Sequence, residues 1–196
     1  MRIVKLAKQD ETPDNYQEMK EWFDKRTDRH IERVQKFCQK IEDFDSDRFK
    51  GLIGRGEVHD QSKYKDPEYD PYVYLTWRYK CEANDKDFEC PEGMDEKIDV
   101  ATEHHITHNA HHPEFYSEKK SGLINRKDRD KPPEQMIDAT KMKDIDIAEM
   151  VADWMAMSEE KENTPKSWAD KNVNIRWKFT DEQKDLIYEL IEEVWG

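Results

Sequence analysis

The residues of this sequence with the clearest chemical potential are its histidines, most of which are concentrated in one short stretch. Neutral imidazoles and carboxylates are the ligands that hold zinc, manganese or iron in proteins. Two histidines lie further upstream, and two aspartates complete a set that could converge on a metal ion. In chain order the set is His30, His59, Asp60, His104, His105, His108, His111, His112 and Asp153. The sequence therefore predicts a metal centre.

Helical periodicity places the two outer members of this set on buried faces. His30 recurs with apolar residues in a helix expected over 28–43, and Asp153 lies among the core positions of a helix expected over 136–158. An unpaired carboxylate among core residues costs several kcal/mol, and a bound cation removes that cost. Asp153 is therefore expected to face a metal ion, although a buried lysine is the alternative partner.

The histidine-rich stretch is expected to form a helix over about 95–112 that stops at Pro113. On this helix, His105 and His112 share one narrow face with apolar residues, so these two are the expected ligands. The other three histidines of the cluster are interpreted as polar positions on a half-exposed helix. They are His104, His108 and His111.

The remaining pattern predicts an all-α fold, a helical bundle with long polar loops and a C-terminal helix. Further helices are expected at about 14–25, from about 46 into a turn, at 72–83 and at 181–195, the last opened by a capping box from Thr180 to Gln183. Residues 1–6 alternate in polarity and could form a short strand. The expected divisions are a lead-in over 1–26, a metal-binding helical domain over 27–158 and a linker with a packing helix over 159–196.

Composition limits the partners of this chain. Its 196 residues suit one domain, and the formal net charge of -13, without a block of basic residues, disfavours long nucleic acids. A small phosphorylated molecule remains open, because a dication reverses the field of its own site. Aromatic residues near the C-terminus could pack on the domain or on a second copy of the chain, so a homo-oligomer also remains open. They are Trp168, Trp177 and Trp195.

The cysteines and the hydropathy pattern bear on the cellular compartment. Cys38, Cys81 and Cys90 are odd in number and widely spaced, which argues against a disulfide framework and against a zinc ribbon. No stretch has the length or apolarity of a signal peptide or a membrane span. The cytoplasm, with no membrane partner, is the default expectation.

The order of the predicted ligands resembles a known superfamily. His30, His59-Asp60 and Asp153 are similar in type and order to the four metal ligands of the HD-domain metal-dependent phosphohydrolases. Residues 59–63 resemble the HD-x-GK motif of its cyclic-dinucleotide phosphodiesterase branch, with Ser62 in place of glycine, and residues 109–114 resemble the HH-E element of that branch. The GYP element is absent, so the substrate of that branch is not carried over. The pattern is most similar to an uncharacterised HD-like family of bacterial and phage proteins with HD-x-SK and N-x-HHPE motifs.

The resemblance covers about residues 27–158 and implies an HD-domain-like helical bundle that hydrolyses phosphoesters with metal-activated water. It implies that His30, His59, Asp60 and Asp153 hold a first ion. His105 and His112 would hold a second ion or donate hydrogen bonds to the phosphate. The expected cofactor is therefore one or two divalent ions per chain, chosen from Mn, Fe, Co, Ni, Zn and Mg.

Three other parts of the chain have expected roles at this site. Lys63 would neutralise a phosphate or pair with a ligand carboxylate, with a surface lysine as the alternative. Glu149 would orient a histidine ligand, with an ordinary solvated carboxylate as the alternative. The loop over 117–135 would close over the substrate. Its basic residues are Lys119, Lys120, Arg126 and Arg129.

Three functions compete at this stage. The first is a phosphohydrolase acting on a nucleotide or another small phosphoester. The second is an HD-type di-iron oxygenase, which the extra histidines His105 and His112 would suit. The third is a non-catalytic nucleotide-binding module, against which the intact ligand set argues.

Overall fold

The computed structural model describes residue 13, residues 15–124 and residues 131–195, and the expected all-α fold is confirmed for this part of the chain. The α-helices are α1 Tyr16–Phe44, α2 Leu52–Val58, α3 Tyr69–Glu82, α4 Met94–His108, α5 Asp144–Glu160, α6 Pro165–Asn172 and α7 Asp181–Trp195. Two short 3-10 helices are η1 Gln61–Tyr64 and η2 Pro113–Tyr116. Strands β1 Ile137–Asp138 and β2 Trp177–Lys178 pair in parallel. None of the helices in the described residues is long and apolar enough to cross a membrane.

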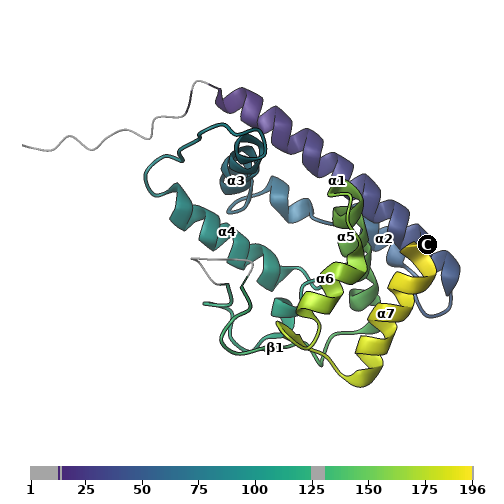
Figure 1. The fold of residues 1–196 in the computed structure, drawn as a ribbon. Coiled ribbons are helices and arrows are strands. Elements are labelled where there is room, and N and C mark those ends of the chain that lie inside the picture. The colour runs from purple at the N-terminus through teal and green to yellow at the C-terminus, as the bar shows by residue number, and fades with distance from the viewer. Residues whose placement is uncertain (1–12, 14, 125–130, 196) are drawn as a thin grey trace, which may run out of the picture.

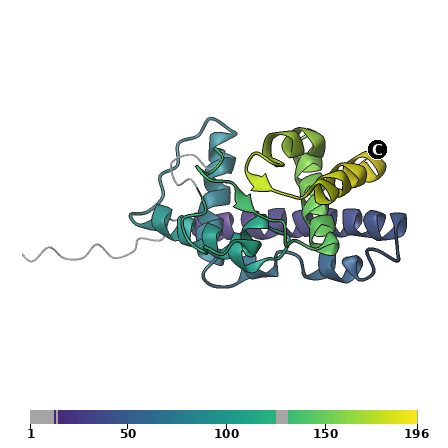
Figure 2. The ribbon, with the colours of Figure 1, turned by 90° about the horizontal axis from the view of Figure 1, so that it is seen from below.

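Helix α1 is the longest element and organises the others. It runs along one side of the molecule, with α3 against its N-terminal half and α2, α5 and α7 against its C-terminal half (Figure 1). Seen from below, α1 spans most of the width of the fold and α5 crosses it (Figure 2). The sequence predicted two helices here, over 14–25 and 28–43, and this was wrong. Between the two predicted helices, Thr27 is buried on the same helical face as Phe23 and His30. No glycine or proline interrupts the helix there.

The core consists of two hydrophobic clusters that lie at different heights along α1. Met19 and Phe23 belong to a cluster shared with α3 and α4, whereas Val34 and Phe37 belong to a larger cluster shared with α2, α5 and α7. His30 lies on the same buried face of α1, between these two sets. A polar layer therefore separates the apolar clusters at the height of His30.

Helix α4 ends earlier than the sequence predicted. The expected helix over 95–112 stops at His108, because Asn109 takes an extended conformation and its side-chain amide donates to the carbonyl of His105 at 2.8 Å. The backbone N–H of Asn109 donates to the same carbonyl at 3.2 Å, so both donors of Asn109 close the last turn of the helix. Pro113 restricts its preceding residue, His112, which is also extended. His111 and His112 therefore lie on a turn, and the predicted single helical face shared by His105 and His112 is wrong.

Several other boundaries also differ from the sequence-based expectation. The helix expected over 136–158 begins at Asp144, because Ile137–Asp138 pairs as β1 with β2. The linker expected over 159–178 contains α6 and β2. The capping box that opens α7 is confirmed, with Gln183 N donating to Thr180 Oγ1 at 3.2 Å and Thr180 N donating to Gln183 Oε1 at 2.9 Å. The strand proposed for residues 1–6 lies outside the described residues.

The C-terminal tryptophans pack on the domain. Trp177 stacks on Trp154 of α5 with ring centroids 5.8 Å apart, and Trp195 stacks on Phe37 of α1 at 5.6 Å. Trp168 remains more than a third exposed. Residues after 158 therefore contribute to the larger hydrophobic cluster.

The contact between α1 and α2 depends on Gly56. A Cβ at this position would lie 3.2 Å from the Cβ and Sγ of Cys38, whereas a Cβ at Gly54 on the same helix would meet nothing within 4 Å. We predict that Gly56→Ala destabilises the protein by about 1–3 kcal/mol through overpacking. Gly54→Ala, the matched control, should be neutral or stabilising by up to about 1 kcal/mol because alanine favours helix. Urea unfolding of both variants measures the difference, and equal stabilities would contradict a tight α1–α2 contact.

The side chain of Glu42, on α1, caps the N-terminus of α2. Its carboxylate accepts from the backbone amides of Ile53 at 2.7 Å and Gly51 at 3.2 Å, and these bonds hold the pKa of Glu42 below its ordinary value of 4.5. A lowered pKa means that the ionised form contributes stability above the unfolded pKa, and that this contribution is lost as the pH falls through the folded pKa.

We therefore predict that wild type is more stable than Glu42→Gln at neutral pH and that the two converge as the pH falls below about 4.5. Thermal unfolding of both proteins across this pH range measures the effect. A stability gap that stayed constant with pH would contradict a role for the charge.

Candidate metal centre

Side chains from four separate segments meet around the carboxylate of Asp60. His30 comes from α1, Asp153 from α5, and His105 from α4, while His59 and Asp60 lie where α2 ends and η1 begins. The six ligands predicted from the sequence are therefore neighbours in one cluster, the last being His112 on the turn after α4.

On one side of the cluster, His30 lies between two carboxylates. Its Nε2 atom is 3.1 Å from Asp153 Oδ1 and 3.5 Å from Asp60 Oδ2. Burial of the imidazole opposes protonation, but the bonds to Asp153 and Asp60 outweigh it and raise the pKa of His30 to about 9. Burial alone would likewise raise the pKa of Asp153, but the hydrogen bond from His30 holds that pKa well below its usual range. His30 and Asp153 thus form a close imidazole–carboxylate contact.

On the other side, three imidazoles turn the same nitrogen towards Asp60. The Nε2 atoms of His59, His105 and His111 lie 3.5, 3.3 and 3.7 Å from Asp60 Oδ1. Burial and the neighbouring His59 lower the pKa of His111. Burial and Lys63 act in the same direction on His105, but contacts with Asp60 and Glu68 outweigh them and raise the pKa of His105.

Five side-chain atoms of this cluster are buried without a hydrogen-bond partner among the described residues. They are His30 Nδ1, Asp60 Oδ1 and the Nε2 atoms of His59, His111 and His112. Burial and the neighbouring histidines also hold the pKa of His112 well below its usual range. Buried polar groups in native proteins are almost always partnered, so a concentration of unpartnered ligand atoms calls for an explanation such as a bound ion. Groups that could ligate one ion overlap here: His30, His59 and Asp60; His59, His111 and Asp153; and His105, His111 and His112.

Glu149 supports two of these imidazoles from behind. Its Oε1 atom lies 2.9 Å from His59 Nδ1 and 3.3 Å from His111 Nδ1. Burial of Glu149 opposes ionisation, but the bonds from His111 and His59 hold its pKa well below the ordinary value. Because an ionised carboxylate only accepts hydrogen bonds, both Nδ1 atoms carry the proton and both Nε2 atoms are free to ligate. Glu149 is thus placed as the sequence predicted, behind histidines rather than in solvent.

The backbone and Lys63 hold Asp60 itself. Asp60 lies in the left-handed region with φ of 58°. This conformation is uncommon for a residue other than glycine, although aspartate tolerates it better than most. Lys63 Nζ lies 2.5 Å from Asp60 Oδ2. Of the roles considered for Lys63, the structure shows the pairing with the carboxylate of Asp60.

The structure changes the interpretation of the three histidines that were treated as polar surface positions. His111 is buried and faces Asp60, because the chain turns after Asn109. His104 is half-buried and donates to Glu68 at 2.7 Å. His108 is exposed and stacks on His104 with ring centroids 4.0 Å apart. The expectation was therefore wrong for His111 and right for the exposure of His108.

Sequence reasoning also missed two charged residues beside the histidines. Glu68 lies in a proline-flanked stretch that read as a loop, yet its side chain is fully buried against His104 and His105. Arg55 Nε donates to Glu149 Oε2 at 2.7 Å, and its terminal nitrogen lies 2.6 Å from Asp146 Oδ1. Asp146 also accepts from the hydroxyl of Tyr116 at 2.6 Å. Asp146, Glu149 and Asp153 recur along one side of α5, and this acidic row was a usable signal for a basic partner such as Arg55. No periodicity marked Glu68.

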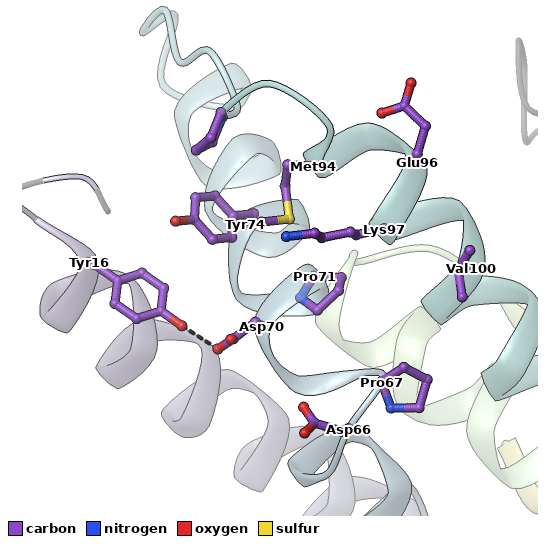
Figure 3. Close-up of a pocket in the computed structure, with 11 residues that line it drawn as sticks. Tyr16, Asp66, Pro67, Asp70, Pro71, Tyr74, Met94, Glu96, Lys97 and Val100 are labelled. Atoms are coloured by element: carbon purple, nitrogen blue, oxygen red, sulfur yellow. Dashed lines mark hydrogen bonds between the residues drawn. The ribbon is translucent and has the colours of Figure 1, made fainter. Parts of the chain in front are cut away.

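A small pocket connects the cluster to the surface. Its volume is about 200 Å³, and its walls include Arg55, Val58, His108, Asn109 and Ala110 beside His59, Asp60, His111 and Glu149. A larger cavity of about 560 Å³ lies elsewhere, between the start of α1, α3 and α4. Figure 3 shows Tyr16 and Asp70 pointing at each other across its rim, and none of the clustered histidines lines it.

The loop that was expected to close over a substrate is described only in part. Lys119 and Lys120 are exposed, and Lys120 donates to the carbonyl of Phe115. Arg126 and Arg129 lie outside the described residues.

Comparison with known proteins yields one finding. A protein-family model described as a family of unknown function (DUF5662) matches residues 19–193, which include all the residues of the cluster. No curated protein and no solved structure matched the chain.

The Arg55 contacts give a test of the support behind the cluster. Replacing Arg55 by methionine keeps most of the volume but leaves Asp146 and Glu149 without their cation. Breaking a buried ion pair costs about 3–5 kcal/mol. The Arg55 side chain is 32% exposed, so we predict a smaller loss, on the order of 2 kcal/mol.

The measurement is urea unfolding of Arg55→Met beside Arg29→Met, a control on α1 whose side-chain nitrogen donates to the carbonyl of Lys25. If both variants lost the same stability, the Arg55 bridge would not be a specific support.

Proposed function

We propose that this chain, which belongs to the family of unknown function DUF5662, is a metal-dependent phosphohydrolase that acts on a nucleotide or another small phosphoester. The proposal rests on one observation above all. Buried imidazole nitrogens from separate segments surround Asp60, and several of these ligand atoms have no other partner in the described part of the chain. The order of His30, His59-Asp60 and Asp153, similar to that of the HD-domain phosphohydrolases, supports the same activity.

The spacing of the ligand atoms fits a divalent ion. Atoms bound to one ion at about 2.1 Å lie about 3.0–4.2 Å from one another. The distances from His30 Nε2 to Asp153 and Asp60, and from the three imidazoles to Asp60 Oδ1, run from 3.1 to 3.7 Å. The donor set of imidazole and carboxylate suits Mn, Fe, Co, Ni or Zn better than Mg, which prefers oxygen ligands.

The excess negative charge of the cluster also fits a bound divalent ion. Five buried or largely buried carboxylates meet here: Asp60, Glu68, Asp146, Glu149 and Asp153. Among the described residues, Arg55 and Lys63 are the permanent cations in contact with them. Such an excess of buried negative charge is costly unless protons or metal ions compensate it.

The residues divide into two groups for this role. His30, His59, Asp60 and Asp153 would hold the first ion, while His105, His111 and His112 beside Asp60 Oδ1 would hold a second ion or donate to a phosphate oxygen. When bound, a divalent ion supplies Lewis-acid activation of water and neutralises phosphate charge. Lys63, next to Asp60, adds a positive charge at the same place. Glu149 keeps the protons of His59 and His111 on the nitrogens that face away from the centre.

The pocket favours a small substrate. Its volume of about 200 Å³ is below the roughly 300–1,000 Å³ typical of pockets for drug-sized ligands. This volume favours a phosphate with a modest substituent. The net charge of -13 and the neutralised Arg55 offer little attraction to a long polyanion.

A di-iron oxygenase is the second candidate. The observation that favours it is the additional group of His105, His111 and His112 next to the first set of ligands, since histidine-rich two-metal sites suit iron. Two irons per chain with oxygen uptake would support this candidate over hydrolysis.

The test is metal content and phosphatase activity of protein purified without chelator. We predict at least one divalent ion per chain and manganese-, cobalt- or nickel-stimulated hydrolysis of small phosphoesters. His59→Ala should lose the metal and lower kcat/KM by more than about 100-fold, because outer-sphere changes alone cost about 10- to 100-fold.

His108→Ala is the matched histidine control for metal content, because His108 is exposed and its Nδ1 bonds to the carbonyl of His104. Absence of bound metal in wild type, even after incubation with Mn²⁺, would sink the proposal and leave a helical binding module.

A further inference from the structure

We infer that Glu68 is a positioning residue of the metal centre, which fixes the orientation and the tautomer of His105. This inference rests on the proposed metal site. It concerns a residue with no sequence motif, at the start of α3, outside the segments that supply the candidate ligands.

The side chain of Glu68 contacts two histidines and one serine. Oε2 lies 2.9 Å from His105 Nδ1 and accepts from Ser62 Oγ at 2.9 Å, while Oε1 lies 2.7 Å from His104 Nδ1. The side chain of Glu68 is 0% exposed. An ionised carboxylate only accepts, so the proton of His105 is held on Nδ1. The Nε2 lone pair of His105 then faces Asp60 Oδ1, 3.3 Å away.

A purely structural role for Glu68 fits its contacts less well. Glu68 is the N-cap residue of α3, where a carboxylate commonly accepts from the first backbone amides of the helix. Its side chain makes no such capping bond. The ion-pair partners of Glu68 in the described residues are the imidazoles of His104 and His105 rather than a lysine or an arginine. The hydrogen bonds that compensate the burial of this carboxylate therefore come mainly from the histidines.

Glu68 repeats, behind His105, the arrangement that Glu149 has behind His59 and His111. Glu149 binds the Nδ1 atoms of His59 and His111, and Glu68 binds that of His105. Each imidazole that points Nε2 at Asp60 Oδ1 thus has a buried glutamate behind it. Outer partners of this kind set ligand orientation and basicity, and their loss typically weakens metal binding by about 10- to 100-fold.

The test measures metal affinity rather than activity. Metal-free wild type, Glu68→Gln and Glu68→Ala are titrated with Co²⁺ against a competing chelator, and the visible absorption of bound Co²⁺ is recorded. We predict that Glu68→Gln weakens Co²⁺ binding by about 10- to 100-fold and Glu68→Ala by at least as much. The Co²⁺ spectrum should also change, since the His105 ligand is no longer held in place.

Asp66→Asn is the matched control, because Asp66 is an exposed carboxylate on the same loop. It should leave both the affinity and the spectrum unchanged. Circular dichroism of each metal-free protein verifies folding, and the nearly isosteric Gln variant keeps the test valid if the Ala variant does not fold.

The outcomes separate the two proposals. Wild-type affinity and an unchanged Co²⁺ spectrum in folded Glu68→Gln and Glu68→Ala would overturn the role of Glu68 and leave the metal site standing. Failure of wild type itself to bind Co²⁺ would overturn the proposed function, and the inference with it.

Discussion

The carboxylate of Asp60 must be compensated, because it is enclosed with other ionisable groups between two apolar clusters. Burial of an uncompensated charge would cost a large part of the few kcal/mol by which a domain is stable. Imidazoles, Lys63 and a candidate metal ion are the available partners. Much of the fold can be understood as the means of bringing these partners to one point beside a small surface pocket.

The helices meet this constraint through specific local features. The continuous α1 carries His30 at the level between the two hydrophobic clusters. Gly56 lets α2 approach Cys38 closely, so that the chain leaves α2 with His59 and Asp60 directed inward. Asn109 ends α4 and turns the chain back so that His111 reaches the side of Asp60 opposite His30. Outside this ring, Glu68 and Glu149 hold the imidazoles, and Arg55 holds Glu149.

The sequence predicted the inner residues of the cluster and missed much of their support, for identifiable reasons. His30 could be placed because it recurs at helical spacing with the buried residues of α1, and Asp153 because it stands in a segment of α5 that is buried almost all round. The prediction for His111 was wrong because Pro113 marks only the latest possible end of α4. The actual end depends on the extended conformation of Asn109 and its hydrogen bonds to the carbonyl of His105. Glu68 could not be predicted, since its burial results from contacts distant in sequence. The break predicted within α1 reflects weak local signals that tertiary packing overrides.

Anomalous X-ray scattering from crystals loaded with Mn²⁺ or Zn²⁺ tests the central claim most directly. The account predicts an anomalous peak within about 2.0–2.3 Å of Asp60 and of the Nε2 atoms of neighbouring histidines, inside the ring formed by His30, His59, His105 and Asp153. A structure without a peak there, in which water molecules bind the buried imidazole nitrogens, would contradict it. Peaks confined to surface carboxylates would contradict it equally.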